Sequence, residues 1–175
     1  WGVWHRSLSV PQRSQLRLNT NSAEITTNTD YWGNTAPTST QFTVGNSLLT
    51  GGNGQTYVAY VFAHDDQSFG TGSDEAIIKC GSYTGNGSAT GPVIDLGFEP
   101  QWFLVKSSTS EGNWVMLDNM RGVNDSDHDA NLYANTTEVE GTNTFASFSS
   151  TGFQIKTSSI YLNSNGQTYI YMAIR

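Results

Sequence analysis

The amino-acid sequence predicts an all-β protein: a β-sandwich of jelly-roll or lectin-like type, with two related units of which the first is incomplete. Three observations support this: the composition, stretches of alternating apolar residues, and an internal repeat. Ser, Thr, Asn and Gly (20, 21, 15 and 18 residues) account for 74 of the 175 residues, and these types favour strands and turns over helices. Five Trp, eight Tyr and eight Phe supply the core that a disordered polar chain lacks.

Strands are expected where apolar residues alternate between turn signals. In chain order these stretches are residues 2–8, 40–44, 56–62, 75–83, 101–108, 113–120, 144–149, 152–157 and 168–174. Ser149–Gly152 predicts a hairpin turn between two of them. No stretch shows a convincing helical pattern, and residues 129–140 are the only place where a helical turn would not be surprising.

The stretch at 56–62 carries apolar side chains on both of its faces. One face would hold Val58, Tyr60 and Phe62, and the other Tyr57, Ala59 and Val61. A strand that is apolar on both faces is typical of the middle of a sheet covered on both sides. Residues 168–174 repeat this arrangement, so both stretches are predicted to be central strands.

The internal repeat is clearest where "NGQTYVAYVF" (53–62) returns as "NGQTYIYMAI" (165–174), an offset of 112. Upstream, residues 42–44, 18–20 and 1–4 can be laid near residues 153–155, 134–136 and 114–117. Residues 1–63 therefore correspond to about 114–175, whereas residues 76–113 have no counterpart in the first half.

The repeat predicts a partial first unit (1–63), a connector rich in Gly, Ser and Asp (64–74) and a second sandwich unit (75–175). Three alternatives remain for the strands that the first unit lacks. They lie upstream in a longer native chain, a neighbouring molecule supplies them, or both units close one joint core.

The charge balance excludes several classes of partner. Eight Lys and Arg against fifteen Asp and Glu give a net charge of −7, which argues against nucleic acid and anionic lipid. No apolar run approaches the ~20 residues of a membrane-spanning helix, so no membrane insertion is expected. The single cysteine, Cys80, rules out an internal disulfide bond.

Four motifs resemble a repeated β-rich domain of tail-fibre-like virion proteins from marine tailed phages, including cyanophages. They are "GSYTGNG" (81–87), "LGFEPQWFLVK" (96–106), "NWVMLDNMRG" (113–122) and "NGQTYIYMAIR" (165–175). The resemblance covers nearly the whole chain. It implies a virion surface protein, extracellular when outside the host, with a native chain that extends at both ends and no assigned enzyme activity.

The sharpest local motif is "DSDHDAN", in which Asp125, Asp127, Asp129 and Asn131 alternate. Oxygen ligands at every second position of a loop suit Ca²⁺ and resemble the opening of an EF-hand loop. The sixth position is Ala130 instead of Gly, and the twelfth is Thr136 instead of Glu. The alternatives are a calcium site and a solvated acidic loop; no other cofactor is expected.

Carbohydrate binding is a second candidate activity, because sugar sites on β-sandwiches combine exposed aromatic faces with Asn and Asp. Tyr31, Trp32 and Asn34 form one such cluster, and Tyr133 with its flanking asparagines is another. The alternative is that these rings plug loops at the ends of the sandwich.

No catalytic constellation stands out. There is no G-x-S-x-G motif, the three histidines lie in different surroundings, and no pair of acids is singled out among fifteen. We therefore expect a structural protein and not an enzyme. The resemblance implies part of a phage tail fibre or surface appendage, homo-oligomeric with a trimer favoured, which contacts other virion proteins and a host surface glycan. The alternatives are a lectin-like module and a non-viral extracellular fibre subunit.

Overall fold

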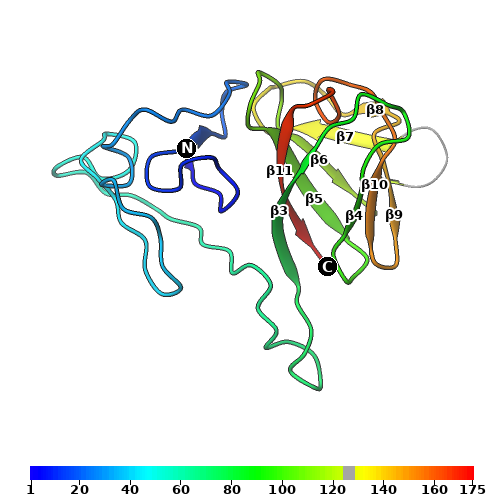
Figure 1. Cartoon of the computed structure of the whole chain (residues 1–175), viewed down its shortest axis with the longest axis horizontal. Helices are drawn as coiled ribbons and strands as arrows, with labels where there is room; N and C mark the ends of the chain where they lie inside the picture. Colours follow the sequence, from blue (N-terminus) through cyan, green and yellow to red (C-terminus); the bar gives the residue numbers. More distant parts are fainter. Residues whose placement is uncertain (124–128) are drawn as a thin grey trace.

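The computed structural model describes residues 1–123 and 129–175, and it confirms the all-β, sandwich-like fold. Eleven strands form three antiparallel sheets in the described residues, and Figure 1 shows the sandwich with the N-terminal part of the chain beside it. Within these two ranges there is no helix that could span a membrane.

Six strands form the main sheet, in the order β3-β11-β5-β6-β7-β8, and three form a second sheet, in the order β4-β10-β9. A short pair, β1-β2, makes the third. The strand bounds are β1 Gly2–Val3, β2 Leu16–Arg17, β3 Ile78–Thr84, β4 Val93–Asp95, β5 Trp102–Ser107, β6 Val115–Asp118, β7 Asp129–Tyr133, β8 Gly141–Asn143, β9 Ala146–Ser149, β10 Gly152–Ile155 and β11 Thr168–Ile174.

The main core lies between the two larger sheets. Phe103 of β5 and Phe153 of β10 stack across the sandwich, with ring centroids 4.8 Å apart and planes 15° from parallel. Tyr83 and Tyr169 stack beside them at 5.2 Å. Close packing of aromatic rings from both inner faces is what holds two sheets together in such a fold.

β11 is an interior strand of the main sheet, with a neighbour on each side. It pairs with β3 over seven residues and with β5 over six. Tyr169 points into the main core, whereas Ile170 packs on the opposite face of the sheet. The prediction that residues 168–174 form a central strand covered on both sides is therefore confirmed.

The outer face of the main sheet is covered by residues 1–25, here called the N-terminal segment. Leu8 and Leu16 from this segment pack against Trp114 and Ile170 and form a second, smaller core. Hydrogen bonds reinforce the contact, including one from the backbone N–H of Glu24 to the carbonyl of Ser108 at 2.8 Å. The chain thus has two separate apolar clusters on the two faces of one sheet.

Six predicted strands are confirmed with small changes of length: those expected at 75–83, 101–108, 113–120, 144–149, 152–157 and 168–174. The predicted hairpin turn after Ser149 is also present. Gly152 follows that turn, where a Cβ atom would lie 1.9 Å from the carbonyl oxygen of Ile94 on β4. Glycine therefore permits the close pairing of β10 with β4.

Three predictions of strands are wrong. The strand expected at 2–8 is limited to Gly2–Val3, and residues 40–44 and 56–62 contain no strand. They lack neighbouring strands to pair with, and an isolated strand is not stable. Residues 129–140, where a helical turn would not have been surprising, begin with strand β7, and residues 131–133 pair with β6. The predicted unit boundaries at residues 63 and 75 stay predictions.

Candidate functional site

Residues 56–62 are the most unusual surface of the molecule. Their sequence nearly matches β11, yet they form no strand and have no sheet partner. Val58, Tyr60 and Val61 are 66%, 72% and 74% exposed. Soluble proteins rarely leave such a concentration of large apolar side chains in water, so this segment is a candidate interaction site.

The exposure extends beyond this segment and is confined to one part of the chain. Eleven of the fifteen exposed large apolar side chains in the described residues lie within residues 1–69. The sandwich that follows buries its own apolar side chains well. This imbalance indicates that the first unit, and not the sandwich, lacks neighbouring segments to cover its apolar side chains.

The loop that leads into residues 56–62 has the same structure as the loop that leads into β11. In each loop a tyrosine hydroxyl donates to the carbonyl nine residues earlier and accepts from the N–H five residues earlier. These bonds join Tyr57 to Leu48 and Gly52, at 2.9 Å each, and Tyr169 to Ile160 and Ser164, at 2.8 Å each. The glycine of each Asn-Gly pair is left-handed, with φ of 72° at Gly54 and 75° at Gly166.

The start of the first unit reproduces a second part of the complete unit. β1 pairs with β2 through Val3 and Leu16, just as β6 pairs with β7 through Met116 and Leu132. The next contact also matches, because the N–H of Leu18 donates to Trp1 and that of Ala134 donates to Trp114, both at 3.1 Å. β1 and β2 are therefore the counterparts of β6 and β7.

β3, β4 and β5 all lie within residues 76–113, the stretch whose sequence has no counterpart in residues 1–63. Residues 1–63 form no strands besides β1 and β2, so β8, β9 and β10 have no strand counterpart there either. In the complete unit β3 and β5 flank β11 on its two sides. Their absence from the first unit explains why residues 56–62 have the sequence of a central strand but no strand neighbours.

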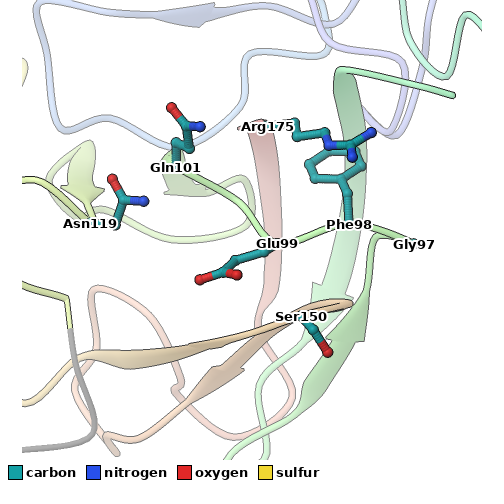
Figure 2. Close-up of a pocket in the computed structure, with 7 residues that line it drawn as sticks. All are labelled: Gly97, Phe98, Glu99, Gln101, Asn119, Ser150 and Arg175. Carbon is teal, nitrogen blue, oxygen red and sulfur yellow. The ribbon is translucent and has the colours of Figure 1, made fainter. Parts of the chain in front are cut away.

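A separate polar hollow of about 450 Å³ lies at the end of the sandwich where β11 finishes. Figure 2 shows its lining residues: Gly97, Phe98, Glu99, Gln101, Asn119, Ser150 and Arg175. The side chains of Glu99, Gln101 and Asn119 are exposed, and Arg175 is ion-paired with Glu75. One carboxylate with amides and a hydroxyl nearby suits hydrogen bonding to a hydroxylated ligand.

The aromatic residues predicted for sugar stacking are not gathered into one site. Tyr31 and Trp32 are buried, and the indole N–H of Trp32 donates to the carbonyl of Ser14 at 2.8 Å. Their rings fill the interior of the first unit instead of offering a face to a sugar. Asn34 is exposed beside them with a left-handed φ of 52°. Tyr133 lies on β7 and packs against Tyr161 at 5.7 Å.

The predicted calcium ligands are only partly described by the structure. Asp125 and Asp127 lie outside the described residues. Asp129 is buried, and its Oδ2 accepts hydrogen bonds from the N–H groups of Phe145 and Ala146, both at 2.8 Å. Asn131 is buried too, and its Oδ1 accepts from Asn143 at 2.7 Å. These two side chains therefore bond to the protein itself, and the calcium site stays a prediction.

Two histidines have lowered pKa values, and both lie where the first unit meets the sandwich. Burial lowers the pKa of His5 from 6.5 to about 4, against an opposing hydrogen bond with the carbonyl of Tyr171. Burial also lowers the pKa of His64, whose Nδ1 accepts from the N–H of Cys80 at 3.0 Å. The Cys80 thiol has a pKa raised to about 11 by burial, so it is protonated near neutral pH.

Sequence reasoning did not single out Lys106. This residue of β5 is fully buried, and its Nζ donates to the carbonyls of Ser107 and Ser110. Burial lowers the pKa of Lys106 to about 8, and Glu111 acts in the opposite direction. Its place in an alternating strand, two residues after Leu104 on the outer face, was the one available signal.

The fold and its unpaired segment define an all-β sandwich protein with an internal repeat, one copy of which is built only in part. The chain belongs to the family described as a domain of unknown function, DUF7483, whose model matches residues 1–175. No curated protein and no solved structure matches it.

Proposed function

We propose that the protein is a structural segment of a repetitive fibre or surface appendage, and that it acts in assembly and in adhesion to a host. One observation carries the proposal: the hydrogen bonds of the Tyr169 loop recur around Tyr57. Detailed repetition of a structural unit within one chain is typical of proteins that build extended arrays. Residues 56–62, an apolar segment without strand partners, offer a place where an adjoining part of such a repeat can add strands.

The finer proposal is a tail fibre or similar appendage of a tailed phage, with the protein located on the virion. It is supported by the four motifs that resemble marine phage virion proteins. These motifs cover β3, β5, β6 and β11, which are neighbours in the main sheet. We further propose a homo-oligomer, with a trimer favoured, bound to other virion proteins.

Electron microscopy of the parent particle tests this function. Gold-labelled antibodies against residues 75–175 should decorate a fibre or appendage on phage particles. Labelling of a fibre on a cell that carries no phage genes would support a non-viral extracellular fibre subunit instead. Labelling of neither would overturn the proposal. Analytical ultracentrifugation of the purified chain gives the oligomeric state.

A carbohydrate-binding module is the second candidate function, and the polar hollow around Glu99 and Asn119 is the observation that favours it. A glycan array would show binding that is lost in Glu99→Ala and Asn119→Ala. The matched control is Glu138→Ala, which removes an exposed carboxylate that does not line the hollow. Equal binding by all three variants would exclude the hollow as the sugar site.

A further inference from the structure

The unpaired segment at residues 56–62 has the properties of a strand whose two neighbours are missing. Its counterpart, β11, has a partner on each side, and the loops before the two segments are alike down to single hydrogen bonds. The loop before residues 56–62 is therefore formed in the same way as the loop before β11. What it lacks is a pair of antiparallel strands of the β3 and β5 type.

The side chains of the segment match those that β11 buries. Tyr57, Ala59 and Val61 correspond at the offset of 112 to Tyr169, Tyr171 and Ala173, which belong to the main core. Val58 corresponds to Ile170, which belongs to the smaller core on the opposite face. Both faces of residues 56–62 are thus prepared for burial, as a central strand requires.

The start of the first unit shows where the missing strands would connect. The amino group of Trp1 donates to Asn19 Oδ1 at 3.2 Å, in the place where the peptide N–H of Trp114 donates to Asn135 Oδ1 at 2.8 Å. In the complete unit, residues 108–114 join β5 to β6, and β1 is the counterpart of β6. A β5-type strand joined ahead of Trp1 by a loop of the same length can pair with β1 and with residues 56–62.

We propose that residues 56–62 are the docking site for strands of the β3 and β5 type, contributed in cis by a segment like residues 75–113 joined directly ahead of Trp1. The occupant is a preceding part of the same repeat, and its insertion converts the first unit into a second sandwich. Extended segments add to sheets in this way because main-chain hydrogen bonds give affinity and alternate side chains give register.

A second copy of this chain fits less well as the occupant. Its β3 and β5 already hold its own β11 between them, over seven and six residue pairs. Residues 56–62 could reach those strands only by displacing β11 from the middle of a formed core. A segment in cis needs no such displacement.

The test compares the 175-residue chain with a longer chain that carries an additional copy of residues 75–113 ahead of Trp1. Hydrogen exchange followed by mass spectrometry reports on the amides of residues 56–62. In the longer chain we expect these amides to exchange at least about 100-fold more slowly, because they enter sheet hydrogen bonds. Exchange in residues 168–174 of the same molecules should not change.

Two substitutions matched in exposure make the test specific. Val61 and Leu48 are 74% and 79% exposed, but their counterparts differ: Ala173 is fully buried and Ile160 is 59% exposed. Val61→Asp in the longer chain should abolish the new protection, whereas Leu48→Asp should leave it in place. In the 175-residue chain neither substitution should alter exchange outside its own surroundings.

Three results would overturn the inference. Unchanged exchange of residues 56–62 in the longer chain shows that such strands do not dock there. Protection that survives Val61→Asp shows that the apolar face is not used. Protection in the 175-residue chain that rises with concentration and accompanies dimer formation shows that a second copy is the occupant.

Discussion

The indole N–H of Trp114 donates a hydrogen bond to the backbone carbonyl of Arg17 at 3.0 Å. This bond joins the loop before β6 to the end of β2, residues that lie 97 positions apart in the chain. Trp114 and Leu16 belong to the smaller core, between the N-terminal segment and the main sheet. The first unit is therefore attached to the sandwich by a buried contact and not only by the connector.

Leu16→Ala should loosen this attachment. Leu16 is almost fully buried, and truncation of such a side chain costs about 2–5 kcal/mol. We expect earlier unfolding in denaturant, together with faster proteolysis within residues 1–63 than within residues 129–175. Leu48→Ala, at an exposed position, is the control and should change little. If Leu16→Ala behaves like that control, the smaller core does not hold the first unit in place.

The two equivalent tyrosines give a matched pair of stability predictions. Tyr169 is fully buried, so Tyr169→Phe removes the two hydrogen bonds of a hydroxyl that water does not reach, one to the carbonyl of Ile160 and one from the N–H of Ser164. The expected loss is about 1–3 kcal/mol of unfolding free energy. Tyr57→Phe removes the same two bonds at a site that is 39% exposed, where water replaces them, and should cost much less. Urea denaturation of both variants measures the difference, and equal losses would contradict it.

Acid should weaken the contact between the first unit and the sandwich through His5. Its Nε2–H donates to the carbonyl of Tyr171 at 3.0 Å, and its Nδ1 accepts from the N–H of Ser7 at 3.1 Å, so the ring is held neutral. The pKa of His5 is about 4 in the folded protein and 6.5 ordinarily, so the unfolded chain binds its proton first. The contribution is fully present above pH 6.5 and is lost as the pH falls toward 4.

Urea denaturation between about pH 5 and 7, above the ordinary carboxylate range, isolates this effect. The unfolding free energy of the unmodified chain should fall on acidification, and His5→Gln should flatten the dependence. His64→Gln is the control, because the pKa of His64 is also lowered but this residue lies nearer the surface. An unchanged pH dependence in His5→Gln would assign the acid sensitivity to other groups.

The sequence predicted β11 well because its signals agree at every level: an Asn-Gly turn, strict alternation and a neighbour on each side. A nearly identical sequence gave a wrong prediction at residues 56–62, where the alternation is intact but the partner strands are missing. Alternation reports which faces a strand can bury, not whether another strand is there to pair with it. The lack of a counterpart for residues 76–113 in the first half already indicated that the first unit is missing strands.

The candidate site residues show a second limit of sequence reasoning. Tyr31 and Trp32 stand among polar and turn-forming residues, which predicted exposure, yet Trp32 finds a buried acceptor in Ser14 eighteen residues away. Lys106 shows the opposite case, a charged side chain that is fully buried on the face of β5 where Leu104 packs against the N-terminal segment. Burial by residues that are distant in the chain produces no periodic pattern in the local sequence. β4 and β8, with three residues each, are too short to show alternation at all.

Asp129 should be required for folding whether or not calcium is present. Asp129→Ala leaves two backbone N–H groups, those of Phe145 and Ala146, without their acceptor in a buried place, at a cost of about 2–5 kcal/mol. Asp129→Asn keeps one acceptor oxygen and should lose less. Melting curves in EDTA and in Ca²⁺ provide the measurement. A loss seen only in Ca²⁺ would show that Asp129 acts mainly as a metal ligand.

Lys106 should make the protein more stable as the pH rises through the alkaline range. Its side chain is fully buried, its ammonium group has two carbonyl acceptors, and its pKa is lowered to about 8 from an ordinary 10.5. Because the folded protein releases this proton before the unfolded chain does, the unfavourable charge acts fully below pH 8. Its effect is relieved progressively up to pH 10.5.

The measurement is the unfolding free energy of the unmodified chain and of Lys106→Met at several pH values between about 7.5 and 10. The unmodified chain should gain stability over this window relative to the variant, which has no group to titrate there. Met fills a similar volume in an apolar surrounding, so the comparison does not depend on a large cavity. Lys79→Met removes a half-exposed lysine whose Nζ is paired with Asp65, and should keep the slope of the unmodified chain. Parallel curves for Lys106→Met and the unmodified chain would mean that Lys106 keeps an ordinary pKa despite its burial.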